Sequence, residues 1–145
     1  LLILAMPAAW AEGINGRQLY FGAGFGSALV SEAVETQSAL QLTIGYPITS
    51  PPQFDSPYNS FAIEAGYVDV SDYDHDSYWV TPVYRRYPNS ELDLVLRVGM
   101  AVGHDTGRTG ALGLEYKIDS ALAVRLEYVE RPKASASLIN VIYRP

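Results

Sequence analysis

The feature that most constrains this chain is an alternation of apolar residues with small or polar residues at every second position. It recurs in segments of about ten residues, which are separated by stretches of turn-forming or acidic residues. The stretch 92–103 shows it most clearly, because Leu, Val or Met stands at every second position from Leu92 to Val102. Successive side chains of a strand point to opposite faces, so this period of two predicts β-strands. A strand of about 9–11 residues can cross a membrane at a tilt.

Eight segments of this kind follow one another, and no long segment repeats its apolar residues at the 3.6-residue period of a helix. The predicted strands are 18–28, 38–48, 59–69, 77–87, 92–103, 109–118, 121–130 and 134–144. An even number of antiparallel strands can close with both chain ends on one side, as in single-chain bacterial barrels. The predicted fold class is therefore all-β, an eight-stranded antiparallel up-and-down β-barrel.

Composition excludes several classes of structure and partner. The chain has 145 residues, enough for one domain, and no cysteine, which excludes disulfides and cysteine chemistry. Charged residues make up 18% of the chain, below the roughly 25% usual in soluble domains. No run reaches the roughly 18 apolar residues that a transmembrane helix needs. The net charge of −6 argues against a nucleic-acid partner, which would need a basic face.

The first eleven residues follow a different pattern. Residues 1–7 are mainly apolar, and Ala9-Trp10-Ala11 supplies the small–x–small motif at which signal peptides are cleaved. We therefore expect residues 1–11 to be the remnant of a signal peptide for Sec export, and residues 12–145 to form the barrel domain. The alternative is that residues 1–11 form a buried N-terminal strand.

Alternation leaves open which face of the sheet is enclosed. The less apolar face carries many glycines and alanines, which leave room for long side chains inside a narrow barrel. Its charges also nearly balance, as an enclosed lumen requires. The alternative is a set of exposed cross-strand pairs on a soluble sheet. The predicted interior polar network is Glu64, Arg85, Asp93, Arg97, Glu115, Lys117, Arg125 and Glu127, with the expected pairs Arg85–Asp93, Arg97–Glu115 and Arg125–Glu115.

Tyrosine is abundant, with 11 residues, and it gathers near the ends of the predicted strands. Amphipathic rings favour the headgroup layers of a membrane, so two aromatic bands are typical of transmembrane barrels. The predicted girdles are Tyr46, Tyr84, Tyr87, Tyr116 and Tyr143 at one end, and Tyr67, Tyr78, Trp79 and Tyr128 at the other. These bands and the signal motif predict that the apolar face meets lipid, which makes the barrel transmembrane.

The predicted connections fall into two sets. Those after the first, third, fifth and seventh strands are polar and are expected to face outside the cell. The turns at 88–90 and 119–120 are short, as periplasmic turns are. The proline-rich connection 48–59 is longer than this rule predicts, and the rule does not account for it.

Three segments resemble the OmpA/OmpX-like family of small outer-membrane barrels. They are the Gly-rich opening 19–26, the Ile-Glu-Ala-Gly-Tyr segment 63–67 and the ending 141–144. The resemblance implies a monomeric scaffold of the Gram-negative outer membrane, with a role in envelope integrity, surface interaction or permeation through a narrow pore. It implies outer-membrane lipid, lipopolysaccharide and the barrel-assembly machinery as partners. One departure is Pro145, which stands where the family's closing strand usually ends in an aromatic residue.

Residues that could support chemistry are few. The acidic run 72–76 resembles the opening of a calcium loop, but Ser77 and Val83 stand where that loop needs Gly and Glu, so no metal site is predicted. No cofactor or catalytic residue is expected either. His75 beside Ser77 leaves open a lipid A deacylase or acyltransferase, since a nucleophile needs an adjacent base. A soluble lipocalin-like lipid binder with an apolar cavity is the remaining alternative.

Overall fold

A computed structural model describes residues 19–30, 36–48, 59–70, 76–86 and 91–145. Each of its strands begins and ends within two residues of the predicted range, which confirms the eight-strand prediction. The described residues do not include residues 1–11, to which the signal-peptide prediction applies, nor Tyr87 and His75. The strands are β1 (Tyr20–Val30), β2 (Gln37–Pro47), β3 (Asn59–Val70), β4 (Ser77–Arg86), β5 (Leu92–Gly103), β6 (Gly107–Lys117), β7 (Leu122–Glu130) and β8 (Ala134–Tyr143).

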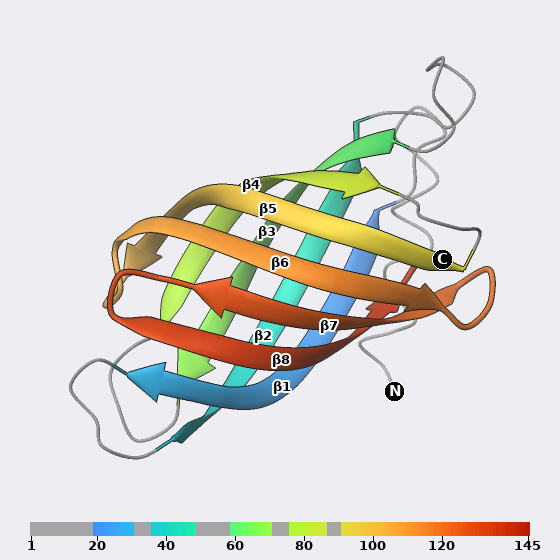
Figure 1. Cartoon of the computed structure of the whole chain (residues 1–145). Coiled ribbons are helices and arrows are strands. Elements are labelled where there is room, and N and C mark those ends of the chain that lie inside the picture. The colour runs from blue at the N-terminus through green and yellow to red at the C-terminus, as the bar shows by residue number, and fades with distance from the viewer. Residues whose placement is uncertain (1–18, 31–35, 49–58, 71–75, 87–90) are drawn as a thin grey trace.

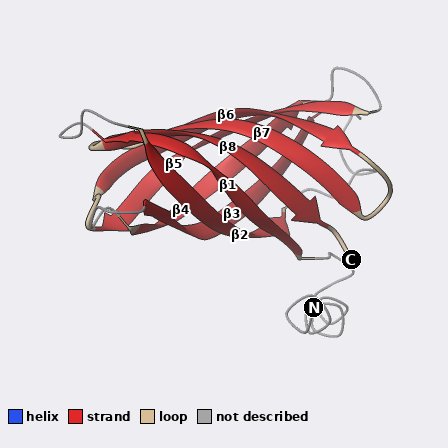
Figure 2. Cartoon of the chain, turned by 90° about the horizontal axis from the view of Figure 1, so that it is seen from below, coloured by secondary structure: helices blue, strands red, loops and turns tan. Residues whose placement is uncertain are grey.

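The strands form one closed barrel in sequence order. Each strand pairs antiparallel with its neighbours in the chain, and β8 closes the barrel by pairing antiparallel with β1, from Phe21 opposite Tyr143 to Val30 opposite Ala134. The strands run steeply inclined around the barrel (Figure 1), and every regular element drawn in Figure 2 is a strand. Within the described ranges, no helix is long and apolar enough to cross a membrane.

The two ends of the barrel differ. We call the end with the connections β1–β2, β3–β4, β5–β6 and β7–β8 the hairpin end, and the end where β1 begins and β8 ends the termini end. The β5–β6 and β7–β8 connections at the hairpin end, 104–106 and 131–133, are short. Gly107, which follows the first of them, has φ +143°, a conformation that residues with a Cβ rarely adopt.

The alternating apolar residues point outward. Leu112 on β6 keeps 54% of its surface exposed and Val98 on β5 keeps 60%, whereas Arg97 and Glu115 on the same two strands are buried. An apolar outer surface around a charged interior is the reverse of a soluble barrel. The lipocalin-like alternative is therefore wrong, because Arg and Glu side chains occupy the space where such a protein has an apolar cavity.

The interior changes character along the barrel. Its half towards the hairpin end is filled by small and medium apolar residues, including Val30, Val70 and Val129, together with the cluster of Val68, Trp79 and Ala101. The half towards the termini end holds most of the buried charges. Apolar packing therefore predominates in the lumen on the hairpin side, whereas on the other side most of the buried charges stand beside a further apolar cluster that includes Val83, Val95 and Ile142.

A candidate functional site in the barrel interior

The barrel interior contains a connected cluster of acidic and basic side chains, which is the candidate functional site. The register of the strands positions it, because every second residue of each strand points inward. Of the charged residues predicted to point inward, seven are buried: Glu64, Arg85, Asp93, Arg97, Glu115, Arg125 and Glu127. Lys117 lies at the termini end, with 34% of its side chain exposed.

Glu64, on β3, is the centre of this cluster. Arg125 donates hydrogen bonds to both of its carboxylate oxygens, at 2.8 Å and 3.1 Å. Arg85 donates to Oε1 at 3.3 Å, and the Tyr20 hydroxyl donates to the same oxygen at 2.7 Å. Arg97 Nε lies 3.8 Å from Oε2. One fully buried carboxylate therefore faces cations from three other strands, which ties β3 to β4, β5 and β7 across the lumen.

Two further carboxylates complete the cluster. Glu127 accepts hydrogen bonds from Arg97 at 2.6 Å and 3.0 Å, and from Gln41 Nε2 at 3.1 Å. Glu115 accepts a hydrogen bond from Arg125 Nε at 2.9 Å and another from Arg144. Charge-assisted hydrogen bonds of this kind offset the cost of removing the ions from water. The site can therefore stabilise the barrel.

Two of the three expected ion pairs are replaced by others. Arg125 does pair with Glu115, its direct cross-strand neighbour. Arg85 is bound to Glu64 and Glu115, while Lys117 takes Asp93 at 3.2 Å. Arg97 reaches Glu127. The predictions Arg85–Asp93 and Arg97–Glu115 are wrong because Arg85 turns to Glu64 on its other neighbouring strand and to Glu115 two strands away, and Arg97 reaches Glu127 two strands away.

Five interior residues lie outside the predicted network: Tyr20, Gln41, Trp79, Asn140 and Arg144. The alternation predicts the inward direction of Gln41, Asn140 and Arg144 but did not assign them to the network. Trp79 was predicted as a girdle residue, and that prediction is wrong. Its side chain is 3% exposed and lies under the Arg97 guanidinium, 4.0 Å from the ring centroid. The alternation contained the signal, because Trp79 is an even number of residues from Arg85 and so points to the same face.

The other described girdle residues lie on the outer surface. Tyr46, Tyr84, Tyr116 and Tyr143 stand in the halves of their strands next to the termini end, and Tyr67, Tyr78 and Tyr128 in the halves next to the hairpin end. Two ring contacts tie aromatic residues of β3 and β4: Tyr67 with Tyr78 at 5.1 Å, and Phe61 with Tyr84 at 5.4 Å between centroids. The outer surface thus has an aromatic band near each end, with aliphatic residues between them.

The connections hold a few further polar contacts. His104 Nδ1 contacts the Asp76 carboxylate at the hairpin end, and the Thr106 hydroxyl donates to the Gly103 carbonyl at 2.8 Å. In the described part of the chain, no group of His, Asp and Glu side chains is arranged to hold a metal ion. At the termini end, the backbone N–H groups of residues 121 and 122 donate to Asp119 and lower the pKa of its carboxyl.

Several solved β-barrel structures superpose on this architecture. A de novo designed transmembrane β-barrel superposes with a TM-score of 0.60 at 14% identity, over 87% of this chain and 95% of that one. The chain has the fold of a transmembrane β-barrel. Ail, the attachment invasion locus protein of Yersinia pestis, superposes with a TM-score of 0.56 at 8% identity, over 87% and 95% of the two chains. Neisserial surface protein A gives 0.50 at 10% identity, over 88% and 96%.

No family model and no curated protein sequence matches this chain. At these identities the structural likeness concerns the fold alone. It agrees with the small outer-membrane barrel architecture that the sequence resemblance implied. The interior network and the outer surface are the features from which a function has to be argued.

Proposed function

We propose that this protein is a non-enzymatic barrel of the Gram-negative outer membrane whose role is to support the envelope. The observation that carries the proposal is the filled lumen. Buried Arg and Glu side chains bridge five strands in one half, and apolar side chains pack the other half. An interior in which side chains contact one another across the lumen offers no path wide enough for solute diffusion.

The two connections at the hairpin end that are described in full support a structural role over a role in surface recognition. The β5–β6 and β7–β8 connections leave little chain to project beyond the membrane. They are also held down, because the Asp105 carboxylate accepts hydrogen bonds from the Lys133 backbone N–H, and Arg131 donates to the Ser77 hydroxyl at 2.9 Å. These contacts tie the two connections to each other and to β4.

The proposal includes a location and a set of partners. The protein reaches the outer membrane as a monomer through Sec export and the barrel-assembly machinery, with its termini end in the periplasm. Its outer surface contacts membrane lipid, including lipopolysaccharide. The aliphatic surface between two aromatic bands supports this placement, since hydrocarbon and headgroup layers match those two chemistries.

Two measurements test the proposal together. Protein extracted from outer-membrane fractions should migrate differently in detergent gels before and after boiling, as folded barrels do. Reconstituted into a planar bilayer, it should give no stable conductance steps. Recovery in the soluble fraction would refute the membrane assignment, and regular open-channel currents would refute the filled lumen.

A further inference from the structure

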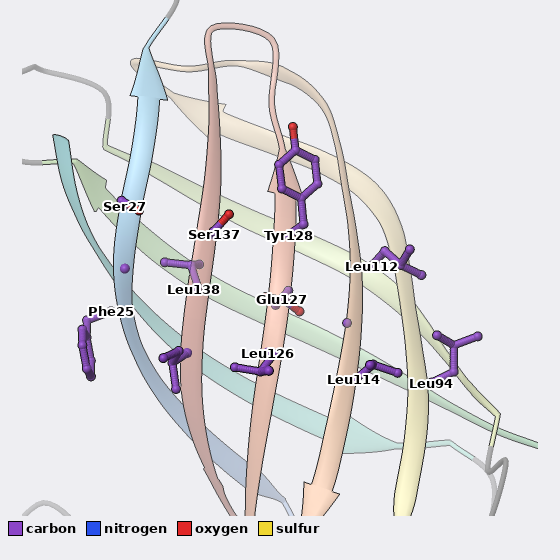
Figure 3. Close-up of a pocket in the computed structure, with 13 residues that line it drawn as sticks. Phe25, Ser27, Leu94, Leu112, Leu114, Leu126, Glu127, Tyr128, Ser137 and Leu138 are labelled. Atoms are coloured by element: carbon purple, nitrogen blue, oxygen red, sulfur yellow. The ribbon is translucent and has the colours of Figure 1, made fainter. Parts of the chain in front are cut away.

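The outer surface carries a trough that begins at the hairpin end over β5, β6 and β7 and widens across β8 to β1. Its upper part is a depression of about 570 Å³ whose lining includes Leu96, Val98, Leu112 and Tyr128. It continues into a second depression of about 670 Å³, lined among others by Leu94, Leu114 and Leu126, and the two share Leu112 and Tyr128. Figure 3 shows the second depression, with the Tyr128 hydroxyl directed towards the hairpin that joins β7 to β8.

Gly110 creates the upper part of this trough. It lies on the outward face of β6, directly between Val98 of β5 and Glu130 of β7. A Cβ atom at this position would meet only the Arg97 carbonyl oxygen, at 3.5 Å, which is an ordinary contact. The neighbouring strands therefore leave room for a side chain that the sequence does not supply. The space is available to a molecule from outside the chain.

Two exposed charged side chains of opposite sign line the upper part of the trough, where Arg131 also contributes to the lining but is buried. Arg108 stands two residues above Gly110 on β6, and Glu130 stands beside Gly110 on β7. Both are exposed, and neither forms an ion pair within the described residues. Arg108 is the one outward-facing cation at the hairpin end of the described strands, because the other, Arg86, lies at the termini end.

We propose that this trough binds a single phospholipid with a phosphoethanolamine headgroup. Arg108 donates to the phosphate, Glu130 accepts from the primary ammonium, and the acyl chains lie along Leu112, Tyr128 and the second depression. Charge complementarity selects this lipid, because a headgroup with two phosphates would place negative charge against Glu130. A trimethylated ammonium would have no N–H to donate to that carboxylate. The inference rests on the proposed placement in a membrane.

Native mass spectrometry of the detergent-folded barrel tests the site, with phosphatidylethanolamine, phosphatidylglycerol, phosphatidylcholine and bis-phosphorylated lipid A added at equal concentrations. The wild-type protein should retain one phosphatidylethanolamine in preference to the other three. Arg108→Gln should weaken its binding about tenfold or more, the effect of losing a hydrogen bond to a charged group. Glu130→Gln should remove the preference over phosphatidylglycerol. Gly110→Leu should fill the trough and prevent binding of every lipid.

Arg86→Gln is the control for the headgroup contacts, because it removes an outward-facing cation beside Leu94, at the end of the barrel opposite to Arg108, and should leave the headgroup preference unchanged. A preference for lipid A in the wild type would overturn the inference. So would a lipid preference that Glu130→Gln leaves intact. A gel comparing boiled and unboiled samples separates the two proposals: a folded barrel without a bound lipid refutes only the site, whereas a chain that never folds in detergent refutes the membrane barrel.

Discussion

Among the charged residues of the lumen, Arg125 should be the one whose replacement by methionine is most damaging. The Arg125 guanidinium contacts all three buried glutamates of the cluster: Glu64 at 2.8 Å and 3.1 Å, Glu115 at 2.9 Å and Glu127 at 3.5 Å. Methionine fills a similar volume and removes the charge, so the three carboxylates stay buried with fewer cations. Breaking one partner of a buried pair typically costs about 3–5 kcal/mol, and we expect a loss of that size in the free energy of unfolding.

The assay is equilibrium urea unfolding of the barrel refolded in lipid vesicles, followed by tryptophan fluorescence. Trp79 is a suitable reporter, because its ring is buried in the lumen against Arg97. Lys117→Met is the control. It breaks the ion pair with Asp93 at 3.2 Å and leaves one buried carboxylate without that partner, whereas Arg125→Met affects three carboxylates, so Lys117→Met should cost clearly less than Arg125→Met.

A second variant separates loss of charge balance from loss of packing. Adding Glu64→Gln to Arg125→Met removes one of the carboxylates left without its main partner, so the double variant should be more stable than Arg125→Met alone. The reasoning is refuted if Arg125→Met unfolds within about 1 kcal/mol of the wild type. It is also refuted if the double variant loses the sum of the two single effects.

Three further predictions follow from other parts of the molecule. Gly45→Val should prevent the barrel from folding in vesicles, because a Cβ at residue 45 would lie 2.0 Å from the Tyr20 ring. Gly110→Ala is the control and should fold normally, because a Cβ at residue 110 would make only an ordinary contact. Gel mobility before and after boiling measures folding of both variants. Asp119→Ala should destabilise the barrel at neutral pH. The lowered pKa of Asp119 means that its contribution is present above its unfolded pKa of about 3.9 and is lost as the pH falls through the lower folded value, so the two unfolding curves should converge in acid. Expression of the wild type and of His75→Ala should give identical lipid A by mass spectrometry, and a change in acylation that depends on His75 would contradict the non-enzymatic proposal.

The membrane-barrel fold was largely predictable because its signal is local. The pleat of a strand puts alternate residues on opposite faces, so Leu112 and Glu115 were assigned to different environments without knowledge of their neighbours. The inward direction of Glu64 and Arg125 followed in the same way. The even number of strands and their antiparallel order followed from the number and spacing of these segments.

The partners across the lumen could not be predicted, because they depend on how far the strands are staggered when the barrel closes. The closed barrel puts Arg97 against Glu127 and brings Arg144 back to Glu115. The trough at Gly110 depends on the same register, since a missing side chain makes a depression only where both neighbouring strands leave it open. The sequence by itself therefore determined which residues face inward, and the tertiary structure decided which of them meet, because flexible charged side chains choose partners by distance across the closed lumen.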